Sequence, residues 1–200
     1  MLSQEGMNMT LSDRKQALTK ALQDPEELVR AAASRALDRV EGLERMHNIF
    51  EAATSGEKPH RIRAIHFLGF LNTVESLNQV LAFLQDPEAD IRVATVKAVQ
   101  VHLPERALVP LLGALEDPDT SVVQVVIETL SHYRDPKITD FLIPFLTGPD
   151  TETACVAAEA LGRNGDPKAE PAMIKVLQGA TDPFLRARTA EALGNLRPNV

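Results

Sequence analysis

Hydrophobic residues recur along this 200-residue chain at a constant step of 31 residues. One column consists of Leu22, Ala53, Leu84, Leu115, Leu146 and Leu177. A second column consists of Leu18, Ile49, Val80, Leu111, Leu142 and Met173. A third column consists of Leu37, Leu68, Val99, Leu130, Leu161 and Leu193; its last step is 32, which places a one-residue insertion after Leu177, near Gly179. Three columns in phase indicate a structural repeat.

Polar residues and prolines divide each repeat into two helices joined by a tight turn. The second helix of most units begins with Asp followed by Pro, at Asp24-Pro25, Asp86-Pro87, Asp117-Pro118 and Asp182-Pro183, with Gly148-Pro149 as a degenerate copy. Asp accepts hydrogen bonds from the free amides of the first turn, and Pro is tolerated there because it has no N–H to leave unpaired. Second helices are predicted at 26–40, 58–71, 88–102, 119–133, 150–163 and 183–196. First helices are predicted at 12–23, 42–53, 74–85, 105–116, 137–147 and 168–178, with bends at Pro110 and Pro144.

Helices this short bury an apolar stripe only by packing on their neighbours, so the repeats are expected to stack. We therefore predict an all-α fold, an α-solenoid of six antiparallel two-helix repeats. No linker or low-complexity run interrupts the series, so residues 11–200 are predicted to form a single domain. Residues 1–10 are predicted to be a flexible N-terminal segment, within which Met1, Met7 and Met9 are each possible starts.

Two stretches, 24–33 (DPEELVRAAA) and 186–196 (RARTAEALGNL), resemble short HEAT repeats of the subtype named after phycobilisome lyases. The resemblance extends over about residues 11–197 and implies a right-handed solenoid. It also implies a structural ladder between an Asp in the turn and an Arg six residues later on the second helix. Asp24 with Arg30 and Asp86 with Arg92 keep this spacing. The other units depart from the pattern: Arg61 and Arg186 keep only the Arg, and Val123 and Ala154 replace it.

Composition and charge narrow the classes of function. The formal net charge is -7, which repels a nucleic-acid backbone, so no nucleic-acid partner is predicted. The single cysteine, Cys155, excludes an internal disulfide and a multi-cysteine metal site. We find no signal-peptide pattern and no apolar run long enough to span a membrane, so a cytoplasmic protein without a membrane partner is predicted.

The second helices of HEAT proteins usually line the concave face, which is the usual binding surface. Residues two, five and nine positions after the Arg column share one side of the second helix. Ten of them form the predicted partner-binding surface: Arg63, His66, Phe70, Lys97, Val101, Val125, Glu128, His132, Val156 and Glu159. The hypothesis is a groove for a protein segment with an apolar centre and charged ends. In the alternative interpretation, the valines pack against neighbouring second helices.

The sequence contains no motif typical of catalysis or of cofactor binding. None of the five histidines forms a pair at i, i+4 spacing, and no phosphate-binding loop or nucleophile elbow is present. We predict no catalytic residue, metal or cofactor. The predicted function is therefore a non-enzymatic protein–protein interaction scaffold or adaptor. The subtype's name supplies the alternative, a subunit of a bilin lyase or isomerase that binds a tetrapyrrole. The sequence does not specify the partner, the pathway or the oligomeric state.

Overall fold

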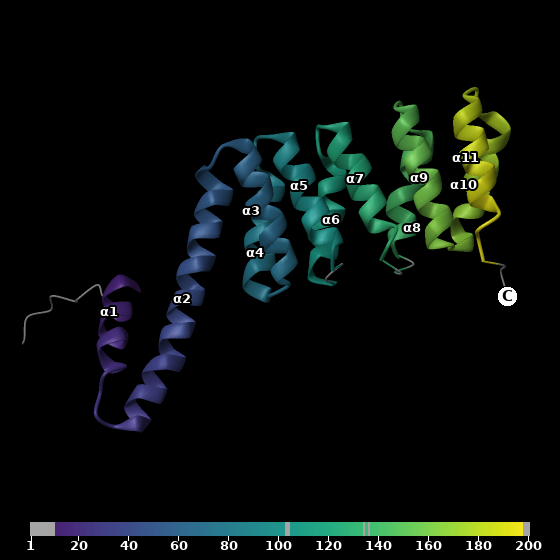
Figure 1. Cartoon of the computed structure of the whole chain (residues 1–200). Coiled ribbons are helices and arrows are strands. Elements are labelled where there is room, and N and C mark those ends of the chain that lie inside the picture. Colours follow the sequence, from purple (N-terminus) through teal and green to yellow (C-terminus); the bar gives the residue numbers. More distant parts are fainter. Residues whose placement is uncertain (1–10, 103–104, 134, 136, 198–200) are drawn as a thin grey trace, which may run out of the picture. The chain divides into compact units, whose positions relative to one another are not determined.

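The computed structural model describes residues 11–102, 105–133, 135 and 137–197, and the description below is confined to them. Its elements, all helical, are α1 (Leu11–Ala21), α2 (Glu27–Ser55), α3 (Lys58–Leu71), α4 (Val74–Ala82), η1 (Phe83–Gln85), α5 (Ala89–Gln100), η2 (Glu105–Ala107), α6 (Leu108–Gly113), η3 (Ala114–Glu116), α7 (Thr120–Leu130), α8 (Lys137–Leu142), η4 (Ile143–Thr147), α9 (Thr151–Asn164), η5 (Pro167–Ala169), α10 (Glu170–Gly179) and α11 (Pro183–Leu193). The prediction of an all-α repeat fold is confirmed (Figure 1).

The chain divides into two compact units, residues 1–56 and 57–200. The first unit contains α1 packed on α2, and the second contains the elements from α3 onward. The single domain predicted for 11–200 stays a prediction, and the predicted flexible segment 1–10 lies outside the described residues.

Helix α2 corrects one predicted boundary. The sequence pattern predicts two helices, at 26–40 and 42–53, whereas the structure has one continuous 29-residue helix, Glu27–Ser55. No proline and no capping residue stands between Val40 and Leu43, where Gly42 is the only helix-weakening residue. One glycine costs a helix about 1 kcal/mol, which is too little to end it without a competing cap.

The remaining helix boundaries in the second unit follow local chemistry. Helix α4 begins with a capping box in which Thr73 and Ser76 bond each other's backbone amides. Asp119, Asp150 and Asp182 cap α7, α9 and α11 through their carboxylates. Three first helices end in 3-10 turns, η1, η3 and η4, and α8 ends at Leu142, two residues before Pro144. Pro110 lies in the first turn of α6, where a proline needs no partner for its nitrogen, and the bend predicted there stays a prediction.

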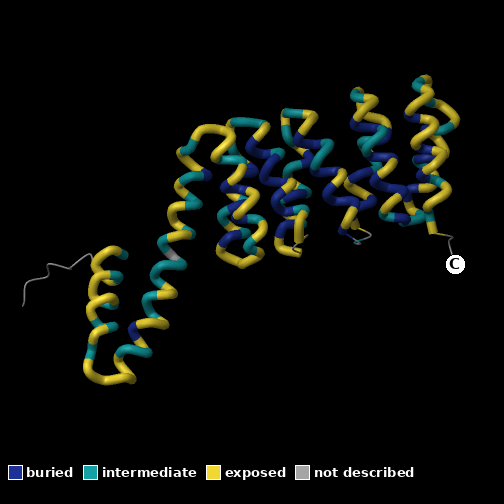
Figure 2. Tube along the Cα trace, in the orientation of Figure 1, coloured by how far each residue is buried: buried dark blue, intermediate teal, exposed yellow. Residues whose placement is uncertain are grey.

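The second unit has two layers of helices. The second helices α3, α5, α7, α9 and α11 pack on one another in sequence order, and the first helices α4, α6, α8 and α10 pack alongside them (Figure 1). The repeating columns supply the core between the layers: Leu68, Val80, Leu111, Leu130, Leu142, Leu161 and Met173 are completely buried. Buried residues accordingly concentrate along the inside of this unit, whereas none of the residues of α1 is buried (Figure 2).

Two glycines allow second helices to approach closely. A Cβ on Gly69 of α3 would lie 2.7 Å from the Ala98 carbonyl oxygen of α5. A Cβ on Gly162 of α9 would lie 2.6 Å from the Ala192 Cβ of α11. Both distances are shorter than van der Waals contact, so the absence of a side chain at these positions fixes the helix spacing.

Candidate functional site

The ten predicted partner-binding residues lie on four consecutive second helices or directly after them. On α3 and α5, or just after α5, lie Arg63, His66, Phe70, Lys97 and Val101. On α7 and α9, or just after α7, lie Val125, Glu128, His132, Val156 and Glu159. Eight of the ten are exposed, and only Val125 and Val156 are half-buried. We call this set the second-helix surface; its role in binding stays a prediction.

The apolar part of the second-helix surface is centred on α3 and α5. Phe70 is 68% exposed and Val101 is 56% exposed, so neither contributes to the core. Phe67, one turn before Phe70 on α3, is also exposed. The half-buried Val125 and Val156 fit the alternative interpretation that they pack among second helices. The apolar centre therefore lies nearer α3 than the sequence pattern places it.

His102 is a member of this region that the sequence reasoning did not single out. Its ring lies 6.4 Å from the Phe70 ring, and its Nε2 lies 3.3 Å from the Phe70 carbonyl oxygen. Because His102 follows Val101 directly, its position one residue outside the periodic column concealed it. The contact joins the residue after the end of α5 to the backbone of α3.

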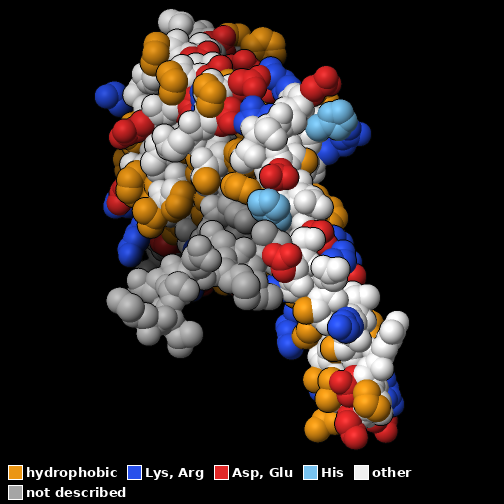
Figure 3. Space-filling model, turned by 90° about the vertical axis from the view of Figure 1, so that its left-hand side faces the viewer, with side chains coloured by type: hydrophobic (Ala, Val, Ile, Leu, Met, Phe, Trp, Pro, Cys, Tyr) orange, Lys and Arg blue, Asp and Glu red, His pale blue; other side chains and the backbone are white. Residues whose placement is uncertain are grey.

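The charged residues divide between α3–α5 and α9–α11. Arg63 and Lys97 have no ion-pair partner within 4 Å among the described residues. Burial, and then the nearby Lys97 ammonium, lower the pKa of His66, so this region is positive through Arg63 and Lys97 rather than His66. Hydrophobic side chains on the surface stand in clusters between charged ones (Figure 3).

On α9 and α11, arginines accompany acidic side chains, one of which is the predicted surface residue Glu159. Arg188 Nε lies 3.0 Å from Glu159 Oε1, and Arg188 Nη1 lies 3.5 Å from Glu191 Oε2. Together with Arg163, these residues line a groove of about 430 Å³ between the two helices. The charge of Glu159 is therefore partly neutralised within the chain itself.

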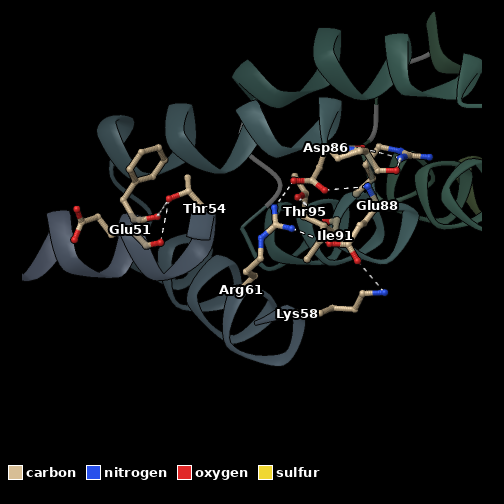
Figure 4. A network of polar contacts seen from close by, with 11 residues as sticks. Glu51, Thr54, Lys58, Arg61, Asp86, Glu88, Ile91 and Thr95 are labelled. Atoms are coloured by element: carbon tan, nitrogen blue, oxygen red, sulfur yellow. Dashed lines mark hydrogen bonds and ion pairs between the residues drawn. The ribbon is translucent and has the colours of Figure 1, made fainter. Parts of the chain in front are cut away.

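A network of arginines joins successive turns at the other end of the second helices. Arg61 pairs with the carboxylate of Asp86, and its Nη1 lies 2.9 Å from Glu88 Oε1 (Figure 4). Arg92 Nε and Nη2 donate to the Asp117 carboxylate at 2.6 and 2.8 Å. Each arginine therefore reaches the acidic residue of the following turn, so Arg61, which lacks an Asp six residues earlier, is still paired.

The six-residue Asp–Arg spacing serves a different bond from the expected one. Arg30 Nη1 and Arg92 Nη1 donate to the backbone carbonyls of Asp24 and Asp86, each at 2.7 Å, rather than to those carboxylates. Arg92, which also bonds Asp117, thereby ties its own turn to the next one, which is a structural role. Where Val123 replaces the arginine, the neighbouring Gln124 bonds Asp150 Oδ2 at 3.3 Å.

The remaining groups of chemical interest are the metal-ligating side chains and Cys155. Within the described ranges, no three His, Cys, Asp or Glu side chains converge as a metal site would require. Burial, and then the Asp182 carboxylate, raise the pKa of the half-buried Cys155 thiol. No helix in the described part of the chain is both long and apolar enough to cross a bilayer.

Comparison with known proteins identifies the family to which this architecture belongs. A family described as HEAT repeats matches residues 15–100 and 139–199. Among solved structures, the complex of CpcE and CpcF of phycocyanin lyase from Nostoc sp. PCC7120 aligns with 21% identity and a TM-score of 0.50, covering 97% of this chain and 79% of that one. An engineered protein aligns with 18% identity and a TM-score of 0.49, covering 94% of this chain and 96% of that one. A search of curated proteins found no match. The likeness to the lyase complex concerns the fold alone, and the family match covers most of the chain: the protein belongs to the HEAT-repeat family.

Proposed function

We propose that this protein is a non-enzymatic scaffold or adaptor that binds a protein partner through the second-helix surface. The observation that carries the proposal is the exposure of Phe70 and Val101 on the helices that carry Arg63 and Lys97, two cations without an ion-pair partner among the described residues. Apolar side chains bordered by charged ones are typical of protein interaction sites. The charges indicate a partner segment that places an apolar side chain beside carboxylates.

Binding on this surface requires little ordering of the chain. Arg63, Phe70 and Lys97 lie on α3 and α5. These two helices pack on each other, and each contributes a buried side chain to the core, Leu68 from α3 and Val99 from α5. A surface carried by packed helices loses less conformational entropy on binding than a loop does, so more of the interaction energy remains as affinity. Arg63 and Lys97 speed the approach of an acidic partner at low ionic strength.

The test is affinity capture from a lysate of the source organism, quantified by mass spectrometry. The variant Phe70→Ala with Val101→Asp removes the apolar centre from two exposed positions, so it leaves the core intact. Val109→Asp is the matched control, because Val109 is 76% exposed but lies on α6, a first helix. A partner retained by the wild type and by the control, and reduced about tenfold or more with the double variant, supports the proposal. Equal recovery with all three proteins contradicts it.

The tetrapyrrole-binding alternative is separated by a spectrum. Its support is the likeness in fold to CpcE and CpcF of phycocyanin lyase, at 21% sequence identity. Incubation of the folded protein with a free bilin is expected to leave the visible absorption spectrum of the bilin unchanged. A shifted and intensified band that co-elutes with the protein on gel filtration contradicts the scaffold proposal and supports a lyase-like role.

A further inference from the structure

Two pockets near the turns that precede the second helices occupy equivalent positions in two repeats. The first has a volume of about 300 Å³ and the second about 410 Å³. Their walls correspond at a step of 62 residues, which is two repeats: Leu84, Gln85, Asp86, Gly113 and Ala114 in the first match Leu146, Thr147, Gly148, Lys175 and Val176 in the second. One difference between them is the residue that occupies the Arg column of the second helix beside each pocket, Arg92 in the first and Ala154 in the second.

In the first pocket a guanidinium group of the chain itself forms part of the wall. Arg92 Nη1 donates to the carbonyl oxygens of Asp86 and Pro87 at 2.7 and 3.3 Å. Its Nε and Nη2 donate to the carboxylate of Asp117 in the next turn. The pocket thus shows which acceptors the fold offers to a guanidinium at this place: two carbonyls of one turn and a carboxylate of the next.

In the second pocket the arginine is missing, but acceptors of the same kind remain. Ala154 occupies the place of Arg92 and is 1% exposed, so its methyl group belongs to the core. The carbonyls of Gly148 and Pro149 correspond to those of Asp86 and Pro87. Ala180 takes the place of Asp117, but the Asp182 carboxylate also lines the pocket. Gly179, near the one-residue insertion, also lines this pocket.

The Asp182 carboxylate is available to a cation. Its Oδ1 accepts from the Leu185 amide at 2.8 Å, and no described cationic group lies within 4 Å of either oxygen. Arg61 and Glu88 show that a carboxylate at this position can serve a guanidinium, because Glu88 is, like Asp182, the first residue before its helix. Lys175 also lines the pocket, and its ammonium has no carboxylate within 4 Å among the described residues, so it repels any cation at the rim. A guanidinium there is held by its hydrogen bonds to the carbonyls and to the Asp182 carboxylate rather than by net charge.

We propose that this pocket receives the side chain of an arginine from a partner protein, in place of the arginine that the chain lacks at position 154. A guanidinium is planar and carries five donors, so it can bond a carboxylate and carbonyls together, whereas a lysine ammonium cannot reproduce the fork. The buried side chains of Leu146, Val176 and Leu185 contact the methylene stem of the arginine. The site is separate from the second-helix surface and does not depend on it.

Three matched peptides test this proposal on the full-length protein by ¹H–¹⁵N NMR titration. They are the blocked pentapeptide Gly-Gly-Arg-Gly-Gly and its versions with lysine or norleucine in the central position. We expect the arginine peptide to shift the amides of Gly148, Gly179 and Ala180 saturably, with at least about fivefold tighter binding than the other two. If the lysine peptide binds as tightly as the arginine peptide, the site does not select a guanidinium and the proposal is wrong. If the norleucine peptide binds more tightly than the arginine peptide, the pocket recognises an apolar side chain and the proposal is also wrong.

Two variants separate this pocket from the rest of the surface. Ala154→Arg supplies the missing guanidinium from within the chain and is expected to abolish the shifts. Asp182→Asn keeps a side chain that caps α11 but removes its charge. It is expected to weaken binding of the arginine peptide about fivefold or more while the fold is retained. Unchanged binding by folded Asp182→Asn overturns the proposal, even if Ala154→Arg does not fold. Neither variant touches Phe70 or Val101, so the outcome is independent of the scaffold test.

Discussion

At the scale of single residues, Gly162 determines how closely α9 and α11 pack. A Cβ at this position would lie 2.6 and 2.7 Å from the Cβ and Cα of Ala192, which are both parts of a buried residue that cannot move aside independently. Gly162→Ala is therefore expected to lower the free energy of unfolding by about 1–3 kcal/mol, as overpacking does elsewhere. Gly113→Ala is the control, because nothing lies within 4 Å of its Cβ, and helix propensity should raise stability by up to about 1 kcal/mol. Urea unfolding followed by circular dichroism measures both changes, and a stabilised Gly162→Ala contradicts the close approach.

Asp117 makes part of the stability depend on pH. Burial alone would raise the pKa of its carboxyl, but hydrogen bonds from Arg92 and from the Asp119 amide outweigh burial, so the pKa is lowered in the folded protein. A lowered folded pKa contributes stability that is present above the unfolded pKa, about 3.9, and is lost as the pH falls through the folded value.

Asp117→Asn tests this dependence. At pH 7 the variant should be less stable by about 1.5–3 kcal/mol, because Arg92 loses a charged acceptor. The gap should narrow at pH 3, below the unfolded pKa of about 3.9, because the unfolded wild-type chain then binds a proton that the folded carboxylate resists. Urea midpoints at the two pH values measure it. Asp140→Asn is the control, since its ion pair with Lys168 is exposed and contributes at most about 1 kcal/mol. A gap of the same size at both pH values shows that the Asp117 charge is not responsible.

At the scale of helices, the sequence predicts what is decided locally. The cap at Asp182 and the span of α3 follow from residues close together in the chain and agree with the prediction. Helices α7 and α9 are instead capped by Asp119 and Asp150, two residues after Asp117 and Gly148, to which the sequence pattern assigned the turns. The direction of the Arg92 bonds depends on the register between stacked turns, which no local pattern contains. The exposed Val109 and Phe141 on first helices were missed for a different reason. Periodicity marks the core-facing positions of a helix and does not assign its other faces.

The continuous helix α2 gives a prediction of its own at this scale. If residues 27–55 form one helix, a proline at Gly42 removes an interior hydrogen bond and should cost about 3 kcal/mol with a loss of helical ellipticity. If two helices met at residues 41–42, as the sequence pattern predicts, a proline there would be tolerated. Gly42→Ala should instead stabilise the helix slightly, since no atom lies within 4 Å of the added Cβ. Circular dichroism and urea midpoints of the two variants distinguish the two arrangements, and a neutral Gly42→Pro contradicts the continuous helix.

At the scale of the whole molecule, stacking restricts each helix to its neighbours. In residues 57–200 the second helices contact the ones directly before and after them, so stability is a sum of repeat and interface contributions rather than of one central core. Arg61 and Arg92 add polar links between successive turns on α3, α5 and α7, where Ile91, Val126, Ile127 and Leu130 are completely buried. The central repeats therefore have apolar and ionic contacts on both sides.

This arrangement predicts a gradient of local opening along the chain. Amides of α7, which has neighbouring helices on both sides and several completely buried side chains, should exchange slowest. Amides of α1, in which no residue is buried and which packs on α2, should exchange faster by on the order of 100-fold or more. Hydrogen–deuterium exchange with mass spectrometry resolves the two helices directly. Arg92→Met should raise exchange in α5 and α7 while α1 is unaffected, because the lost bonds join only neighbouring turns. Equal protection of α1 and α7 would instead indicate that the chain opens as one cooperative body, and the additive account would be wrong.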